Sequence, residues 1–350
     1  MEFLTEYGIF LAKAVTIVVA ILLIISAAAS AAINGKSSEN GHIEVKNLNK
    51  KYEKIKHLMM EHVLDEHALK LYDKQLKKDA KQKAKEAKAQ PEGAIEAKKR
   101  VYVLDFDGDI KASDNEQLRA SITAVLAMAK PGVDEVVVRL ESGGGMVHSY
   151  GLASAQMDRI RSKGVGLTAC VDKVAASGGY MMACVADRII ASPFAILGSI
   201  GVVAQIPNFH RLLQKSHIDF EVLTAGEHKR TLTIFGENTE KGREKFVSDL
   251  EDTHELFKSF VSEHRPVVEI DKVANGDVWF GKRAMDVKLV DELMTSDDYL
   301  LQCCDAADVY AVTYVEKKTL QEKLGIAVST GIEKATLKLL SAMNTNRFMS

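Results

Sequence analysis

The chain has 350 residues, of which 47% are hydrophobic and 27% charged, and its formal net charge is −2. This length predicts two domains, or one domain with appendages, and the hydrophobic share suffices for a sizeable core. The near-neutral balance excludes binding to a polyanion through overall charge. Four cysteines without a CxxC pair indicate neither a disulfide framework nor a zinc site, and we expect no metal and no cofactor.

A stretch of twenty residues without a charge runs from Ala14 to Ile33. As a helix it is long enough to cross a hydrocarbon core of about 30 Å. Its small residues also fit the end of a cleaved secretory signal, but Glu2 and Glu6 remove the positive start that such signals carry. We therefore expect an uncleaved transmembrane anchor over residues 1–35.

Residues 36–99 are rich in charge, and Ala, Lys, Glu and Gln dominate from residue 68 onwards. These residue types are strong helix formers, so we expect a charged helical stalk. An electrostatic contact with anionic lipid headgroups is the alternative interpretation. Nucleic-acid binding is not expected, because no aromatic residues interleave with the lysines.

The pattern changes at residue 100, where short apolar stretches begin to alternate with amphipathic ones. Strands are predicted over residues 101–106, 134–142, 166–171, 187–191, 200–206 and 220–225, and helices over 115–130, 150–163, 178–186 and 240–265. Such alternation indicates an α/β fold with largely parallel strands. We assign it to residues 100–317, followed by a helical tail over 318–350.

The apolar run from Val174 to Ile206 resembles a second membrane span. Asp187 and Arg188 lie in its middle, however, and charges at mid-bilayer are costly. We therefore expect this run to be buried core.

Ser177 follows one predicted strand and precedes a predicted helix, directly before Gly178 and Gly179. A hydroxyl at a helix start lies near free N–H groups that favour developing negative charge. A second glycine cluster, with Gly143 and Gly144, follows another strand and can offer further N–H donors. Both clusters are equally compatible with plain turns, and the second with a phosphate-binding loop.

A nucleophilic serine needs a base, and the residues leave the choice open. The candidates are Lys229 and four histidines at positions 148, 210, 217 and 228. No histidine lies in a recognisable triad signature. A lysine acts as a base only where its surroundings favour the uncharged amine.

Four motifs in order carry a resemblance to a known family. They are AASGGYMMACVAD from residue 175, ASPFAILGSIGVVAQIPN from 191, TAGEHKRTL from 224 and WFGKRAMDVKLVDEL from 279. Over residues 101–293 the chain resembles the signal peptide peptidase A family of serine peptidases.

The resemblance implies a ClpP/crotonase-like fold with a Ser–Lys dyad, in which Ser177 is the nucleophile and Lys229 the general base. It implies an oxyanion hole formed by Gly178, Gly143 and Gly144. It also implies a homo-oligomer in which a neighbouring subunit can supply the lysine, and peptide or protein substrates such as remnant signal peptides or misfolded proteins.

The resemblance further implies a single-pass protein of the bacterial inner membrane with a periplasmic catalytic domain. The lysines after the span favour the cytoplasm instead, by the positive-inside rule. Two other functions stay open from the sequence. One is a crotonase-type acyl-CoA enzyme on the same fold, and the other is a membrane scaffold with a vestigial site.

Overall fold

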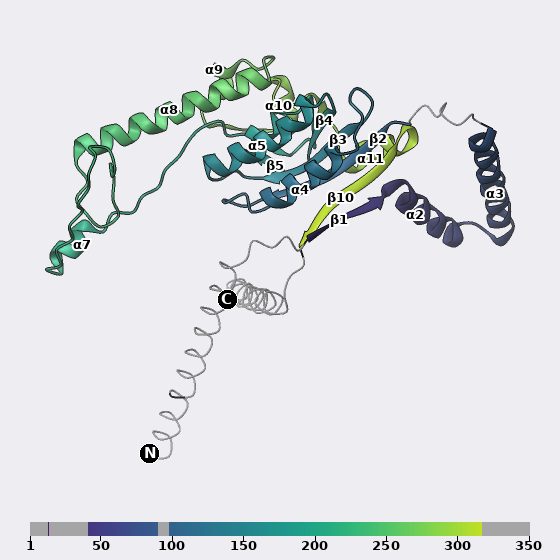
Figure 1. Cartoon of the computed structure of the whole chain (residues 1–350), viewed down its shortest axis with the longest axis horizontal. Helices are drawn as coiled ribbons and strands as arrows, with labels where there is room; N and C mark the ends of the chain where they lie inside the picture. Colours follow the sequence, from purple (N-terminus) through teal and green to yellow (C-terminus); the bar gives the residue numbers. More distant parts are fainter. Residues whose placement is uncertain (1–12, 14–40, 90–97, 317–350) are drawn as a thin grey trace, which may run out of the picture. The chain divides into compact units, whose positions relative to one another are not determined.

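The structure is a computed structural model that describes Lys13, residues 41–89 and residues 98–316 (Figure 1). Residues 43–314 form one compact unit. Among the described helices, none is long and apolar enough to cross a membrane. The predicted anchor over residues 14–33 and the predicted tail over 318–350 lie outside the described residues, so both stay predictions.

Ten strands form a mixed α/β sheet. They are β1 (Gly41–Asn47), β2 (Arg100–Gly108), β3 (Glu135–Ser142), β4 (Gly166–Val171), β5 (Val174–Ala176), β6 (Arg188–Ala191), β7 (Ile196–Gly198), β8 (Val278–Phe280), β9 (Glu292–Leu293) and β10 (Asp308–Glu316). The helices are α2 (Leu48–Val63), α3 (Glu66–Ala89), α4 (Asn115–Leu126), α5 (Val147–Ser162), α6 (Gly178–Ala183), α7 (His210–Lys215), α8 (Glu240–His264), α9 (Ile270–Val273), α10 (Gly281–Asp286) and α11 (Ser296–Ala306).

The main sheet has the order β1-β10-β2-β3-β4-β6-β9, and a branch of three strands leaves it at β3. Strand β3 pairs with β4 over Glu135–Arg139 and then, at Ser142, with Ala175 of β5. Strand β5 continues the branch through β7, which pairs antiparallel with β8. Because β3 and β5 are parallel neighbours, the loops that follow them emerge at the same edge.

Both faces of the sheet are covered, as expected for a parallel sheet. Alternate residues of β2 serve the two faces: Tyr102 and Leu104 belong to one apolar cluster, Val101 and Val103 to the other. Helices α4, α5, α6 and α8 contribute to the first cluster, and α2 and α11 to the second. The hydrophobic spacing of Leu118, Ile122 and Val125 explains why α4 forms and packs there.

Two predicted strands are wrong. The segments predicted as strands over residues 200–206 and 220–225 contain no strand, and their large apolar side chains from Val203 onwards are exposed. Strand propensity is realised only where a neighbouring strand accepts the pairing, and neither segment has such a partner in the described chain. The run from Val174 is largely buried core as predicted, but Phe194 is 83% exposed and the burial ends at Ile200. The sheet also includes residues 41–47, which the sequence assigns to the stalk.

A buried carboxylate, Glu135, ties the start of β3 to its neighbours. Lys99 Nζ donates to its Oε2 at 2.7 Å, and Thr168 Oγ1 and Tyr299 Oη donate to its Oε1 at 2.7 Å and 2.5 Å. Burial raises the pKa of Glu135, but the hydrogen bonds from Lys99, Tyr299 and Thr168 outweigh this effect and hold it below its ordinary value of 4.5.

Because the pKa of Glu135 is lowered in the folded protein, we expect the stability of the fold to decrease in acid. The Glu135 carboxylate has a lower pKa in the folded than in the unfolded protein, so it contributes its full stabilisation above pH 4.5. This stabilisation is lost as the pH falls through the pKa of the folded protein. Glu135→Gln should destabilise the fold by about 1–3 kcal/mol at neutral pH. It should also reduce the fall of Tm between about pH 5 and about pH 3. Thermal melts of both proteins across that range test this, and parallel pH profiles would contradict it.

Candidate active site

Ser177 occupies a strained turn between β5 and α6. Its backbone angles, φ 52° and ψ −118°, lie in a region that residues other than glycine rarely adopt, at a cost of about 1–3 kcal/mol. Two hydrogen bonds hold the turn: Ser177 N donates to the Gly198 carbonyl at 2.8 Å, and Met181 N donates to the Ser177 carbonyl at 2.9 Å. The side chain is half-buried, and no described residue is hydrogen-bonded to its hydroxyl. The hydroxyl is therefore available to react.

The two glycine clusters meet at this turn. A Cβ on Gly144 would lie 2.7 Å from both Gly178 N and Ser177 Cβ, and φ at Gly144 is +88°. A Cβ on Gly179 would lie 2.5 Å from the Ser142 carbonyl oxygen. Only glycine allows so close an approach of the two backbones. The pairing of β3 with β5 thus brings the second glycine cluster, Gly143 and Gly144, against the predicted nucleophile. This cluster is called the glycine corner below.

The three predicted oxyanion residues differ in their surroundings. Gly178 is buried against Tyr150, while Gly143 is exposed and has open space where a side chain would be. The N–H of Gly144 already donates to Ser142 Oγ at 3.1 Å. The structure brings Gly144 and Gly178 to Ser177, and the donor role of all three stays a prediction.

No hydrogen bond joins Lys229 to Ser177 among the described residues of one chain. Lys229 lies in the segment between α7 and α8, is exposed, and its backbone N–H donates to the Gly226 carbonyl at 3.2 Å. No described residue pairs with its amine. Among the described residues, none of the four candidate histidines is hydrogen-bonded to Ser177, and His228 lies 3.9 Å from the carboxylate of Glu227. The base therefore stays a prediction.

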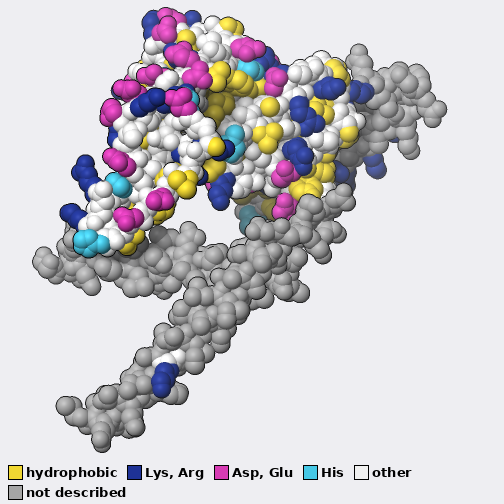
Figure 2. Space-filling model, turned by 60° about the vertical axis from the view of Figure 1, so that its left-hand side comes forward, with side chains coloured by type: hydrophobic (Ala, Val, Ile, Leu, Met, Phe, Trp, Pro, Cys, Tyr) yellow, Lys and Arg dark blue, Asp and Glu magenta, His cyan; other side chains and the backbone are white. Residues whose placement is uncertain are grey.

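The segment that carries Lys229, residues 201–239, is called the arm here. Every residue of the arm is described, and Gly236 is the one that is buried. Large apolar side chains are exposed along it, among them Val203 at 81% and Leu223 at 89%. Figure 2 shows hydrophobic side chains exposed among charged ones on the side of the molecule that it presents. Exposed apolar residues in such number are typical of an interaction surface.

The thiols lie apart from this chemistry. Cys170 and Cys184 are buried, and burial raises the pKa of each to about 12. Burial likewise raises the pKa of Cys304 to about 11. Thiols with such values are almost wholly protonated at neutral pH and react slowly.

Thiol reagents should consequently leave the enzyme active. We expect iodoacetamide at about pH 8 to modify neither Cys170 nor Cys184 in the folded protein and to modify both after denaturation. Mass spectrometry of the digested protein locates the modification, and residual activity is measured in the same sample. Complete inactivation that tracks the labelling of a cysteine would contradict this expectation.

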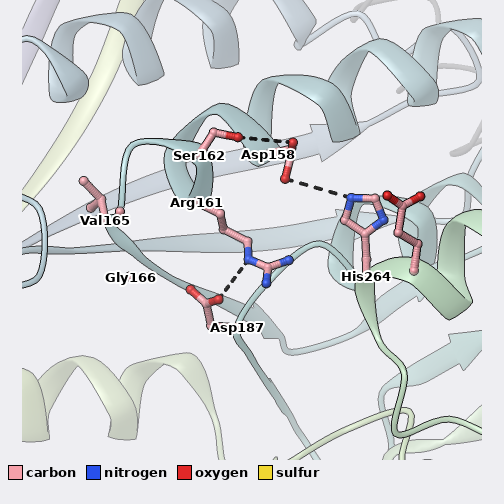
Figure 3. A pocket seen from close by; sticks show the side chains of 9 residues that line it. Asp158, Arg161, Ser162, Val165, Gly166, Asp187 and His264 are labelled. Carbon is pink, nitrogen blue, oxygen red and sulfur yellow. Dashed lines mark hydrogen bonds and ion pairs between the residues drawn. The ribbon is translucent and has the colours of Figure 1, made fainter.

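A polar hollow of about 560 Å³ lies at the other end of β4, where the strand begins (Figure 3). Arg161 Nε donates to Asp187 Oδ1 at 2.9 Å, and His264 Nε2 lies 3.9 Å from Asp158 Oδ1. None of the predicted site residues lines this hollow. Its ion pairs join α5, α8 and the start of β6, which is a structural role.

Two further residues, Ser142 and Tyr150, contact the glycine corner, although the sequence predicts no role for either in the site. Tyr150 offers no local signal beyond its place near a helix start. Its hydroxyl contacts Asp109 and Ser142, at the ends of β2 and β3, and its ring contacts Gly178 at the start of α6. Only the packing of the sheet brings these segments to Tyr150. A sequence pattern therefore does not show these contacts.

Comparisons with known proteins identify the class. Residues 2–157 match the model for the N-terminal part of peptidase family S49, and residues 159–310 match that for peptidase family S49 itself. The chain is 50% identical over 331 residues to the "Probable protease SohB" of Haemophilus influenzae, covering 93% of this chain and 92% of the relative. It is 51% identical over 247 residues to the protein of the same name from Buchnera aphidicola subsp. Acyrthosiphon pisum, covering 71% and 73%.

A more distant relative and a solved structure are also similar. "Protease 4" of Haemophilus influenzae is 25% identical over 201 residues, which cover 55% of this chain and 32% of the relative. A mutant of ClpP1 from Listeria monocytogenes matches 58% of this chain and 94% of its own, with a TM-score of 0.35 and 13% identity. The latter likeness is too weak to carry an argument.

An α/β sheet with a serine at a strained turn, in a chain with these relatives, is a serine-type peptidase, and so a hydrolase that acts on peptides or proteins. More particularly, the chain belongs to peptidase family S49. The resemblance seen in the sequence motifs is confirmed at this level. The acyl-CoA enzyme and the inactive scaffold find no support among these relatives.

Proposed function

We propose that the protein is a membrane-anchored endopeptidase that cleaves peptide bonds with a Ser–Lys dyad. Ser177 is the nucleophile and Lys229 the general base. The observation that carries the proposal is the Ser177 turn: its φ is positive, its hydroxyl has no partner among the described residues, and two glycine backbones pack against it. We also propose that the sheet is of the ClpP/crotonase type, with the β5–β7–β8 branch as the layer that carries the site.

A second copy of the chain supplies the lysine in this proposal. Within one chain the Ser177 hydroxyl and the Lys229 amine both lack a partner among the described residues. The arm that holds Lys229 exposes apolar side chains such as Val203 and Leu223, which a neighbouring subunit would bury. A head-to-tail contact of this kind, repeated around a closed ring, gives every serine a lysine from its neighbour.

The reaction then proceeds in two halves. Ser177 Oγ attacks the carbonyl carbon of the scissile bond while the uncharged amine of Lys229 accepts the hydroxyl proton. Desolvation at a subunit contact favours the uncharged form of a lysine. Backbone N–H groups of Gly178 and Gly143 stabilise the oxyanion, while the N–H of Gly144 donates to Ser142 Oγ and so holds the corner in place. Lys229 passes the proton to the leaving amine, and water then hydrolyses the acyl-enzyme.

Covalent labelling tests the nucleophile. The full-length protein reacts with a fluorophosphonate probe, and mass spectrometry locates the adduct. We expect a single adduct on Ser177 and none in Ser177→Ala. Ser199→Ala is the matched control, because Ser199 also has a positive φ, of 50°, and should leave the labelling unchanged. An adduct that persists in Ser177→Ala would overturn the assignment.

Membrane attachment forms a separate part of the proposal. The uncharged stretch from Ala14 to Ile33 anchors the chain in the bacterial inner membrane, and the catalytic domain faces the periplasm, where remnant signal peptides and misfolded proteins are the substrates. Fusions of alkaline phosphatase and of a fluorescent protein to the C-terminus test the orientation. An active phosphatase supports the periplasmic side, and a fluorescent fusion without phosphatase activity contradicts it.

A further inference from the structure

We propose that Tyr150 is a positioning residue of the active site, which fixes the glycine corner through Ser142 and the residue after the nucleophile through its ring. This inference rests on the proposed function of Ser177. Tyr150 stands in the first turn of α5 and is completely buried. Its two ends contact the two backbone segments that flank Ser177.

The hydroxyl of Tyr150 belongs to a chain of hydrogen bonds that ends at the corner. Tyr150 Oη donates to the Asp109 carbonyl at 2.6 Å and lies 2.5 Å from Ser142 Oγ. Ser142 Oγ lies 3.0 Å from the Gly108 carbonyl and accepts the N–H of Gly144 at 3.1 Å. Since the tyrosine proton is used on Asp109, Ser142 Oγ is the donor in the 2.5 Å contact, and its proton is shared between Tyr150 Oη and the more distant Gly108 carbonyl. A lone pair of Ser142 Oγ stays free to accept the N–H of Gly144.

The ring of Tyr150 packs against the other side of the site. A Cβ on Gly178 would overlap Tyr150 Cγ and lie 2.8 Å from Tyr150 Cβ. Phe106 holds the ring from the sheet side, edge-on, with centroids 6.3 Å apart and planes at 77°. One side chain thus supports Gly178 directly and Gly144 through Ser142.

Catalytic power requires this kind of support. Donors of an oxyanion hole act only when they are aimed at the position of the developing charge before the reaction. Gly143 and Gly144 have no side chains of their own to hold their orientation, and Gly143 is exposed. The hydrogen bond from Gly144 N to Ser142 Oγ holds the corner in place, and the contact with Tyr150 Oη holds Ser142 Oγ in turn.

Burial alone does not account for the hydroxyl. Phenylalanine would fill the same space in an apolar core, and a buried tyrosine hydroxyl is tolerated only with partners. The partners of Tyr150 Oη are Ser142, which accepts the N–H of Gly144 in the glycine corner, and Asp109 in the loop that follows β2. Burial raises the pKa of Tyr150, so the hydroxyl keeps its proton and its role as donor.

The chain offers a matched control in Tyr180. It is also fully buried, and its Oη donates to the Leu289 carbonyl at 3.0 Å, away from the corner. Tyr150→Phe and Tyr180→Phe each remove one buried hydroxyl and its hydrogen bonding. We expect both to lower Tm by a few degrees. Only Tyr150→Phe should lower kcat, by about 10-fold or more, with KM changed by less than about 2-fold.

Two further measurements separate positioning from simple loss of structure. A peptide boronate forms a tetrahedral adduct with a reactive serine, and Tyr150→Phe should weaken its binding by about the same factor as kcat. Ser142→Ala breaks the same hydrogen-bond chain at its other member. The double variant Tyr150→Phe/Ser142→Ala should therefore lose no more kcat than the more impaired of the two single variants, because residues that act as a unit are not additive.

The outcomes decide between the two proposals. If Ser177→Ala keeps its activity, the proposed function fails. If Ser177→Ala is inactive but Tyr150→Phe has the kcat of Tyr180→Phe, the nucleophile stands and the positioning role is overturned. Independent, additive losses in the double variant would overturn it as well. If Tyr150→Phe does not fold, the kcat of Ser142→Ala is compared with that of the Tyr180→Phe control instead. Equal kcat values would overturn the positioning role.

Discussion

Mixing two inactive variants, Ser177→Ala and Lys229→Ala, is expected to restore about one quarter of the wild-type activity. Each variant alone should lose at least about 10³-fold in kcat, because the nucleophile and its base act as a unit. In a ring assembled at random from equal amounts, half of the sites keep their serine and half of these face an intact lysine. The restored activity is measured after the two proteins are denatured, mixed and reassembled.

A second mixture makes this result decisive. Wild-type protein combined with the double variant Ser177→Ala/Lys229→Ala also yields about one quarter if the lysine comes from a neighbour. If both residues came from one chain, the first mixture would yield nothing and the second about one half. That pair of results would rule out the shared site. Size-exclusion chromatography of each mixture verifies that the variants assemble as the wild type does.

Gly144→Ala should abolish most of the activity while the protein still folds. The new Cβ would lie 2.7 Å from Gly178 N and Ser177 Cβ and 2.8 Å from the Ala176 carbonyl oxygen. Two of these are backbone atoms of the nucleophile turn, so the turn itself has to shift. We expect kcat/KM to fall by about 10²-fold or more, similar to the loss of an oxyanion donor.

Gly132→Ala separates this steric effect from backbone strain. Gly132 also has a positive φ, of +71°, but a Cβ there meets nothing within 4 Å. Both variants should lose about 1 kcal/mol of stability or more from the unfavourable φ. Only Gly144→Ala should lose activity. Equal kcat/KM for the two variants would show that the close approach of the corner to Ser177 is unimportant.

Much of the sheet is predictable from local sequence. The strands over residues 101–106, 166–171 and 187–191 are confirmed as β2, β4 and β6, and the helices beginning at Asn115 and Glu240 are confirmed as α4 and α8. The residues of each segment suffice to predict its structure, because a strand buried on both faces is continuously apolar and the apolar residues of a packed helix recur with a period of about 3.6 residues.

The errors arise where a segment depends on a distant partner. The predicted strands over residues 200–206 and 220–225 have strand-like composition but no strand beside them in the described chain, so neither segment forms a strand. Strands β1 and β10 show the opposite case, since both lie in segments for which no strand is predicted, although DVYAVTYVE in β10 has strand-like composition. Strand β10 lies between β1 and β2, and this order joins segments that are distant along the chain, such as Asp308 and Arg100. Local propensity contains no information on such pairing.

The amino-acid sequence by itself determines which residues are candidates for the chemistry: a serine before two glycines at a predicted strand–helix junction, a second glycine cluster after another strand, and a lysine in a motif shared with the family. The tertiary structure alone decides that the two clusters touch, because the end of β3 leaves β4 and pairs with β5. It also decides that Tyr150 packs against them and that Lys229 stays on an exposed arm. The physical reason is that side-chain type is a local property, whereas the approach of two backbones depends on the packing of the whole sheet.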